Sequence, residues 1–125
     1  MSQMTLQPRQ AKSAPIPLFM ADKGVAFLTL DEAGAIVDCD GPVEEMFGYA
    51  PRDLIFRHIS KLIPRLQYME LMQGGHLNPR LHYLCHIGLP FGVQPLEGEP
   101  FSGYLSLTDL SDPLARRVRL GIRLR

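Results

Sequence analysis

The alternation of apolar and polar side chains is clearest in the last ten residues, RRVRLGIRLR, at positions 116–125. Successive side chains of a β-strand point to opposite faces, so this period of two predicts a strand with one buried and one solvent-facing side. The buried side would carry Val118, Leu120, Ile122 and Leu124, and the solvent side Arg117, Arg119, Arg123 and Arg125.

Three further segments predict strands. FSGYLSLTDL at 101–110 also alternates, with an inward side of Phe101, Leu105 and Leu107 and an outward side of Tyr104, Ser106 and Thr108. FGVQPL at 91–96 predicts a short strand, followed by a turn at 97–100. GVAFLTL at 24–30 and AIVDCD at 35–40 flank a turn that ends in Gly34, which predicts a β-hairpin.

Short helices are predicted between these two groups of strands. Asp40 is a candidate N-cap with Pro42 near the first helical position, and Gly48 is placed to end that helix in a left-handed conformation. Residues 41–64 therefore predict consecutive short helices closed by Pro64. Residues 65–76 fit either a short helix or a loop, because Gly74-Gly75 interrupts the helical spacing.

The segment NPRLHYLCHIG at 78–88 predicts a helix, with Asn78 as its cap and Pro79 as its first residue. Its apolar stripe consists of Leu77, Leu81, Leu84 and Gly88, with Cys85 at the edge, and His82 and His86 fall on the opposite side. Two strands, several helices and three more strands, in that order, fit an antiparallel α+β domain rather than a βαβ fold.

Composition narrows the class of protein. The chain has 125 residues, 46% of them apolar, with 13 Lys+Arg against 13 Asp+Glu. This length supports one soluble domain with a single core. The balanced charge provides no overall attraction to nucleic acid or to an anionic membrane. Cys39 and Cys85 form no CxxC motif, so we expect a reduced, cytoplasmic compartment.

Residues 1–21 are interpreted as an N-terminal extension and residues 22–125 as the domain. The extension has too short an apolar run for a signal peptide or a membrane span. Its end carries Leu18, Phe19 and Met20, which are candidates for docking on the domain or contacting a second copy, the alternative being a solvated tail.

Several segments resemble a known family. IVDCDGPVEEMFGY at 36–49 is similar to a strand, a polar turn and a helix of PAS domains, where the helix ends in Glu-x-hydrophobic-Phe-Gly-Tyr. APRDLIFRHISKLIP at 50–64 continues in register with the family's next two short helices, where an L.G..I..LIP pattern is common. LEGEPFSGYLSLTDL and RRVRLGIRLR are similar to its last strands. The chain from Gly24 to Arg125, roughly four-fifths of its length, thus resembles a PAS domain.

The resemblance implies a five-stranded antiparallel sheet with several short helices on one face, and a sensory or protein-interaction role in signal transduction through a dimer or a partner. Such sheets commonly dimerise through their outer face. None of the motifs found in this sequence is typical of an effector domain. The Gly-x-Asn-Cys-Arg-Phe motif of light-sensing relatives is absent, since residues 55–64 contain no cysteine, so a flavin–cysteine adduct is not expected.

His82, Cys85 and His86 have the i, i+3, i+4 spacing of helical metal ligands. Some PAS domains hold haem through a histidine of the helix placed here, so a haem- or metal-binding gas or redox sensor using His82 or His86 is the alternative function. The helical wheel opposes it, because both histidines face away when the leucines face the sheet. We therefore predict no cofactor.

The sequence does not favour a reactive cysteine, an enzyme active site or a nucleic-acid-binding surface. The aspartates beside Cys39 would raise its pKa, and no cluster of basic residues surrounds Cys85, so neither predicts a nucleophile. There is no Gly-x-Ser-x-Gly motif or phosphate-binding glycine loop, so the sequence predicts no enzyme. The arginines at 116–125 follow strand alternation without interleaved aromatic residues, which favours the solvent face of an edge or half-exposed strand over nucleic-acid binding.

The sequence therefore predicts a PAS-like signalling domain with a core that is filled by side chains or holds a small apolar ligand. A ligand-free dimerisation module is the second alternative. The residues expected around a ligand cavity are apolar positions from the helices and the last two strands: Phe47, Ile59, Leu62, Leu81, Leu84, Cys85, Leu105 and Ile122.

Overall fold

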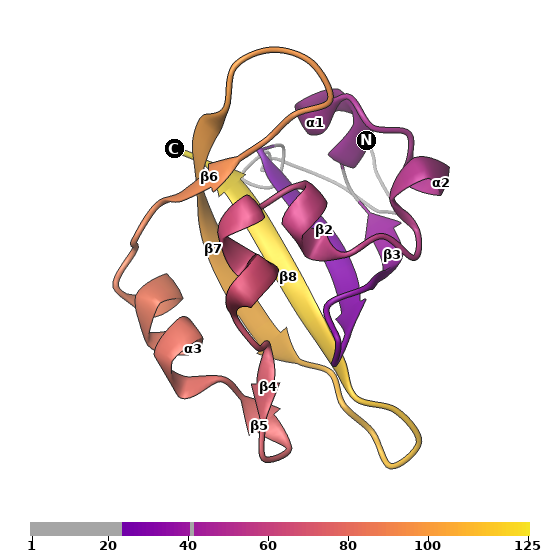
Figure 1. The fold of residues 1–125 in the computed structure, drawn as a ribbon, viewed down its shortest axis with the longest axis vertical. Coiled ribbons are helices and arrows are strands. Elements are labelled where there is room, and N and C mark those ends of the chain that lie inside the picture. Colours follow the sequence, from indigo (N-terminus) through magenta and orange to yellow (C-terminus); the bar gives the residue numbers. More distant parts are fainter. Residues whose placement is uncertain (1–23, 41) are drawn as a thin grey trace, which may run out of the picture.

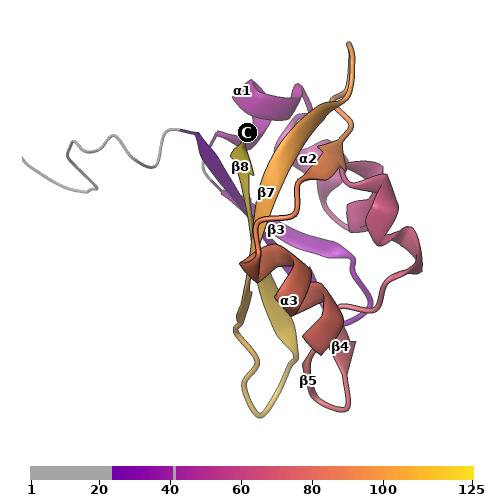
Figure 2. The ribbon, with the colours of Figure 1, turned by 90° about the vertical axis from the view of Figure 1, so that its left-hand side faces the viewer.

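The computed structural model describes residues 24–40 and 42–125. Its centre is a five-stranded antiparallel sheet in the order β3-β2-β8-β7-β6, with the helices on one face (Figures 1 and 2). The strands of this sheet are β2 (Val25–Asp31), β3 (Ile36–Asp40), β6 (Phe91–Val93), β7 (Phe101–Asp109) and β8 (Arg117–Leu124). The other elements are α1 (Val43–Phe47), α2 (Pro51–Leu54), α3 (Pro79–His86), the 3-10 helices η2 (Ile59–Lys61) and η3 (Pro64–Tyr68), and the two-stranded β4 (Met72–Gln73) and β5 (His76–Leu77).

The strand at the end of the chain, β8, lies in the middle of the sheet (Figure 1). It pairs with β2 on one side and with β7 on the other, both antiparallel. Leu120 consequently lies opposite Leu28 of β2 and Leu107 of β7, and all three are buried. The predicted antiparallel α+β architecture is confirmed, and β8 is a central strand with one exposed face rather than an edge strand.

The predicted alternation in β7 and β8 is confirmed along most of both strands. Val118, Leu120 and Ile122 are fully buried, whereas Ser106 and Thr108 are exposed. The prediction is wrong for Leu124, which is 43% exposed. It has the inward parity, but it lies at the end of β8 and lines an open surface hollow together with Met46 and Phe101.

Helix α1 follows the β2–β3 hairpin. Its C-terminus ends at Gly48 as predicted, but its N-terminus differs from the prediction. Gly48 adopts φ +85° and donates its N–H to the Glu44 carbonyl oxygen at 2.8 Å. Asp40 was predicted to cap α1, but Pro42 is the N-cap residue and no side chain caps it. Asp40 ends β3 opposite Phe27, which directs its carboxylate across the sheet to Arg119, at 3.6 Å.

Pro64 was predicted to close the short helices of residues 41–64, but it begins a helix instead. It is the first residue of η3, where a proline is tolerated because the first N–H groups of a helix have no partner within it. The ambiguous segment that follows forms η3 and then the small β4–β5 hairpin. Gly74 and Gly75 make its turn with φ of +59° and +82°.

Helix α3 forms as predicted. The Asn78 side-chain oxygen accepts hydrogen bonds from the N–H groups of Arg80 at 3.0 Å and Leu81 at 3.4 Å, and Pro79 is the first helical residue. Leu81 is fully buried, and Leu84 packs against the core. Within the described ranges, no helix is long and apolar enough to cross a membrane.

Candidate functional site

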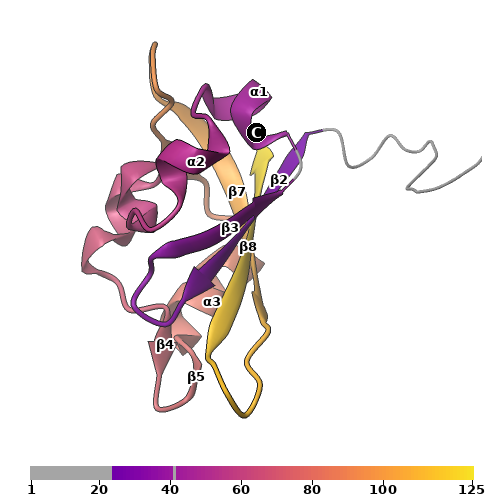
Figure 3. The ribbon, with the colours of Figure 1, turned by 90° about the vertical axis from the view of Figure 1, so that its right-hand side faces the viewer.

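The sheet face opposite the helices is not covered by any of the described elements (Figures 2 and 3). We call this surface the outer face. The strand registers give its side chains: Val25, Phe27, Thr29 and Asp31 from β2, Asp38 and Asp40 from β3, Ser102, Tyr104, Ser106 and Thr108 from β7, and Arg117, Arg119, Gly121 and Arg123 from β8.

Arg119 contacts both an aromatic ring and a carboxylate on the outer face. Its guanidinium carbon lies 4.1 Å from the centre of the Phe27 ring, a distance typical of a cation–π contact. The same guanidinium lies 3.6 Å from the Asp40 carboxylate. Both partners of this ion pair are substantially exposed, so the pair contributes little to the free energy of unfolding and mainly orients the arginine over the ring.

A closely packed glycine and a hollow lie in the middle of the outer face. Gly121 occupies an outward position of β8, between Phe27 of β2 and Ser106 of β7. A Cβ atom there would lie 2.5 Å from the Ser106 Oγ and 3.1 Å from the Phe27 ring, so no larger residue fits without movement. Gly121 is also one of the residues that line a hollow of about 300 Å³ on this face.

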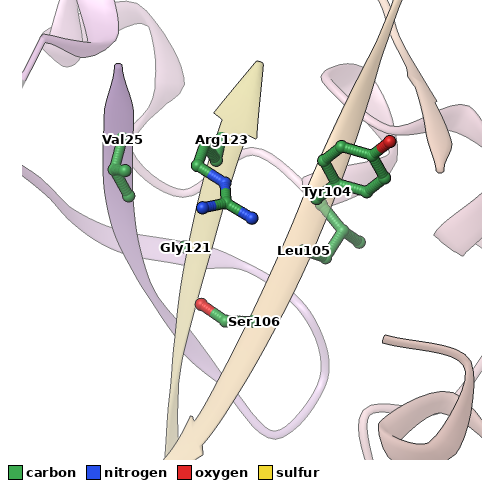
Figure 4. Close-up of a pocket in the computed structure, with 6 residues that line it drawn as sticks. All are labelled: Val25, Tyr104, Leu105, Ser106, Gly121 and Arg123. Atoms are coloured by element: carbon green, nitrogen blue, oxygen red, sulfur yellow. The ribbon is translucent and has the colours of Figure 1, made fainter. Parts of the chain in front are cut away.

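The walls of this hollow combine apolar and polar groups. Val25 and Tyr104 lie on either side of Arg123, whose guanidinium turns toward Gly121, and the Ser106 hydroxyl points from β7 toward β8 (Figure 4). Arg123 lies 5.9 Å from the Tyr104 ring centre. Within the described part of the chain Arg123 forms no ion pair, so its charge is available to an external acidic group.

Comparisons with known proteins identify the fold. No protein-family model matches the sequence, and no curated protein matches it. A PAS domain from a two-component sensor histidine kinase superposes with a TM-score of 0.61 at 15% identity, covering 86% of this chain and 91% of that one. The PAS domain of a Desulfitobacterium hafniense protein gives 0.60 at 13% identity, covering 86% and 99%. The PAS domain of nitrogen regulation protein NR(II) from Vibrio parahaemolyticus gives 0.57 at 14% identity, covering 90% and 100%.

The chain has the PAS fold. The predicted resemblance is thereby confirmed at the level of the fold, through structures that share only 13 to 15% of their residues with this chain. At such identity the side chains that would carry a specific function must be assessed from this molecule itself.

The histidines of α3 point away from the core of this PAS fold. His82 and His86 are both exposed, whereas Leu81 on the other side of the helix is fully buried. Within the described residues, no three His, Cys, Asp or Glu side chains are close enough together to hold a metal ion. A haem ligand from this helix would require α3 to rotate and expose its leucines.

Both cysteines have raised pKa values. Burial raises the pKa of Cys85 from its ordinary value of 9.0 to about 11. The pKa of Cys39 is also raised, mainly by burial and secondly by the Asp38 carboxylate. The direction predicted for Cys39 is confirmed, although burial and not the neighbouring charge is the larger cause. Both thiols therefore stay protonated near neutral pH.

The residues predicted to surround a ligand cavity gather in the core between the helices and the sheet. Six of them are buried in one cluster, and Leu84 and Cys85 pack against it. The six are Phe47, Ile59, Leu62, Leu81, Leu105 and Ile122. The structure thus brings the whole set together, as side chains that fill the PAS core.

The predicted contact residues Leu18, Phe19 and Met20 lie outside the described residues, as does the extension 1–21. The hollow of the outer face was not predicted from the sequence. A signal for it exists, because Gly121 stands at the one position of RRVRLGIRLR where the outward arginine pattern is interrupted. What that glycine faces depends on Phe27, which is distant in the sequence.

Proposed function

We propose that this chain is a sensory or protein-interaction PAS domain of signal transduction, and that its outer face contacts a second copy or a partner protein. The observation that carries this proposal is the outer face itself: an exposed sheet surface with Arg119 over Phe27 and a hollow at Gly121. Tyrosine and arginine are enriched among the residues that dominate the energy of protein interfaces. Tyr104 and Arg123 would be the anchors of this contact.

A signal can reach this face through the strands themselves. Leu105 and Ile122 face the core, and their neighbours along the chain, Tyr104 and Arg123, face outward. A small apolar ligand that entered the core would have to displace side chains such as Leu81, because protein interiors are closely packed. Displacement of β7 or β8 would then move the two outer anchors, which would bias the contact with the partner.

The dimer contact is tested by measuring mass against concentration with light scattering. We expect the full chain to rise above its monomer mass of 14.0 kDa as concentration increases. Tyr104→Glu should shift this rise to higher concentration, because it places a desolvated negative charge in the outer-face contact and weakens it. Tyr83→Glu is the matched control, since Tyr83 is 60% exposed on α3, away from the sheet face. Equal curves for Tyr104→Glu and the unmodified chain would rule out the outer face as the dimer contact.

The extension is tested in the same assay. Burial of Leu18, Phe19 and Met20 would favour association by about 1.5–3 kcal/mol each before the cost of ordering them is subtracted. A chain lacking residues 1–21 should therefore associate more weakly. An unchanged oligomeric state would show that these residues make no contribution to the dimer.

A further inference from the structure

Phe56 combines a strained backbone with an exposed ring. It is the one described residue other than glycine with a positive φ, +70°, and its side chain is 81% exposed. The left-handed region is unfavourable for a bulky side chain, and exposure gives the ring no compensating burial. Among the described residues the Phe56 side chain therefore has a conformational cost and little packing benefit.

The fold needs the backbone of this segment but not the ring. The N–H of Phe56 donates to the Ile36 carbonyl oxygen at 2.7 Å, and the N–H of Ile36 donates to the Arg57 carbonyl oxygen at 2.8 Å. These bonds attach the segment after α2 to the start of β3. Glycine would make the same bonds with less strain, since it adopts positive φ freely.

The segment around Phe56 is basic, and the segment that precedes it in the chain is acidic. Residues 51–68 carry Arg52, Arg57, Lys61 and Arg65 against a single acidic residue, Asp53. Residues 24–50 contain no lysine or arginine and carry Asp31, Glu32, Asp38, Asp40, Glu44 and Glu45. Among the described residues the only ion pair joins Arg119 to Asp40, so the basic side chains around Phe56 have no acidic partner among those residues.

A third surface hollow carries acidic residues, in contrast to the basic segment around Phe56. It has a volume of about 410 Å³ and lies between α1 and the loop that follows β6. Its apolar part includes Met46 and Leu96, the latter 56% exposed, and its rim carries Glu45 and Glu97. The Leu96 N–H donates to the Phe47 carbonyl oxygen at 2.8 Å, which fixes the loop against the helix.

We propose that Phe56 of one copy inserts into this hollow of a second copy, where Arg52 and Arg57 lie beside Glu45 and Glu97. The hollow exceeds the volume of a phenylalanine side chain, and its acidic rim complements the two arginines that flank Phe56. A second copy supplies both surfaces at once, because every copy carries Phe56 with its neighbouring arginines and also the hollow with Glu45 and Glu97. The contact is independent of the outer face and leaves that face open to its own partner.

The experiment measures association of the 125-residue chain by sedimentation, with Tyr104→Glu in every variant so that association through the outer face is weakened throughout. Phe56→Gly removes the ring, and Leu96→Lys places a positive charge in the hollow. We expect each to raise the dissociation constant by at least about tenfold. An equimolar mixture of the two variants should form heterodimers, because one supplies an intact hollow and the other an intact Phe56.

Two controls distinguish loss of this specific contact from unfolding and from a general loss of exposed hydrophobic surface. Phe56→Gly should melt no lower than its parent, since the strain is relieved. Tyr68→Ala removes an aromatic ring that is 88% exposed in the same basic segment, and it should leave association unchanged. The proposal is overturned if the parent stays monomeric at all concentrations, if folded Phe56→Gly associates as its parent does, or if the mixed variants fail to form heterodimers.

Discussion

Gly34 and His58 join the first hairpin to the helical layer through a contact that only one residue type permits. Gly34 ends the β2–β3 turn with φ +94°, and its carbonyl oxygen accepts a hydrogen bond from the Ile59 N–H at 2.8 Å. The His58 ring lies over this glycine, and its Nδ1 accepts the Ser60 N–H at 3.1 Å, which caps η2. The turn and the helix thus depend on the absence of a Cβ atom.

Gly34→Ala should lower the free energy of unfolding by about 2 kcal/mol or more. A left-handed conformation costs an alanine roughly 1–2 kcal/mol relative to glycine. In addition, the new Cβ would lie 2.6 Å from the His58 Nε2 and force the ring to move. Urea denaturation measures the change. Gly92→Ala is the control, because no atom lies within 4 Å of its added Cβ; an equal loss in both variants would contradict the role of the His58 contact.

Cys85 should react slowly with iodoacetamide at neutral pH in the folded Cys39→Ser chain. Burial raises its pKa to about 11, so the reactive thiolate forms at higher pH than in the unfolded chain. Between pH 9.0 and about 11 the native state therefore retains the Cys85 proton while the unfolded state loses it. The stabilising contribution of the thiol is complete below pH 9.0 and decreases as pH rises toward about 11. Equal labelling rates in folded and urea-unfolded protein at neutral pH would contradict the raised pKa.

At the scale of elements, α3 is attached to the rest of the molecule at its first turn. Asn78 is only 6% exposed, and it uses both ends of its side-chain amide. The oxygen caps α3, while the Nδ2 group donates to the Glu70 carbonyl oxygen at 2.7 Å. The Asn78 N–H also donates to the Leu71 carbonyl oxygen. One residue therefore fixes both the start of the helix and its position after the β4–β5 hairpin.

Asn78→Ala should destabilise the chain by about 2 kcal/mol, because the helix loses its cap and the Glu70 carbonyl oxygen loses a partly buried hydrogen bond. Asn78→Asp is the informative comparison, since a carboxylate keeps the cap but cannot donate to Glu70. We expect Asn78→Asp to melt between the parent and Asn78→Ala in thermal unfolding. If both variants melt with the parent, Asn78 does not position α3.

At the scale of the whole molecule, the arrangement of the two faces of the sheet determines which functions are accessible. The inner face is filled by apolar side chains from every strand of the main sheet, and the outer face carries arginines and aromatic rings. A ligand must therefore compete with core packing, whereas a protein partner meets a surface that is already exposed. This contrast favours interaction over cofactor chemistry as the proposed role.

The purified 125-residue chain should show no Soret band, and its native mass spectrum should give the bare mass of the monomer or dimer. The reason is that His82 and His86 face solvent and not the core. A stoichiometric Soret band that disappears in His82→Ala or His86→Ala would establish the haem alternative. An extra stoichiometric mass without colour would instead support the small apolar ligand.

Most of the fold was predictable because it depends on local patterns. The period of two in residues 116–125, the glycine of the first turn and the Asn78-Pro79 cap each determine an element through the backbone conformation of its own residues. The errors occurred where a neighbour in space decided the outcome. Asp40 pairs with Arg119 instead of capping α1, and Leu124 lines an open surface hollow with Met46 instead of joining the core.

The candidate sites were less predictable than the fold. The sequence placed Tyr104 and the arginines of β8 on the outer side of their strands, yet it did not reveal the hollow at Gly121. It also did not single out Phe56, because neither a positive φ nor the exposure of a ring can be recognised from residue type. Both features arise from contacts between segments that are distant along the chain.

The sequence by itself determined the strands, the α3 helix and the side of each strand that is buried, since alternation and capping act within a few residues. Only the tertiary structure placed β8 between β2 and β7, which brought Arg119 to Phe27 and Gly121 to Ser106. It also put Phe56 and the hollow beside Leu96 on the surface, unpaired within the described molecule. The physical reason is that strand pairing and packing between layers are set by the closure of the whole core, a property that no local segment contains.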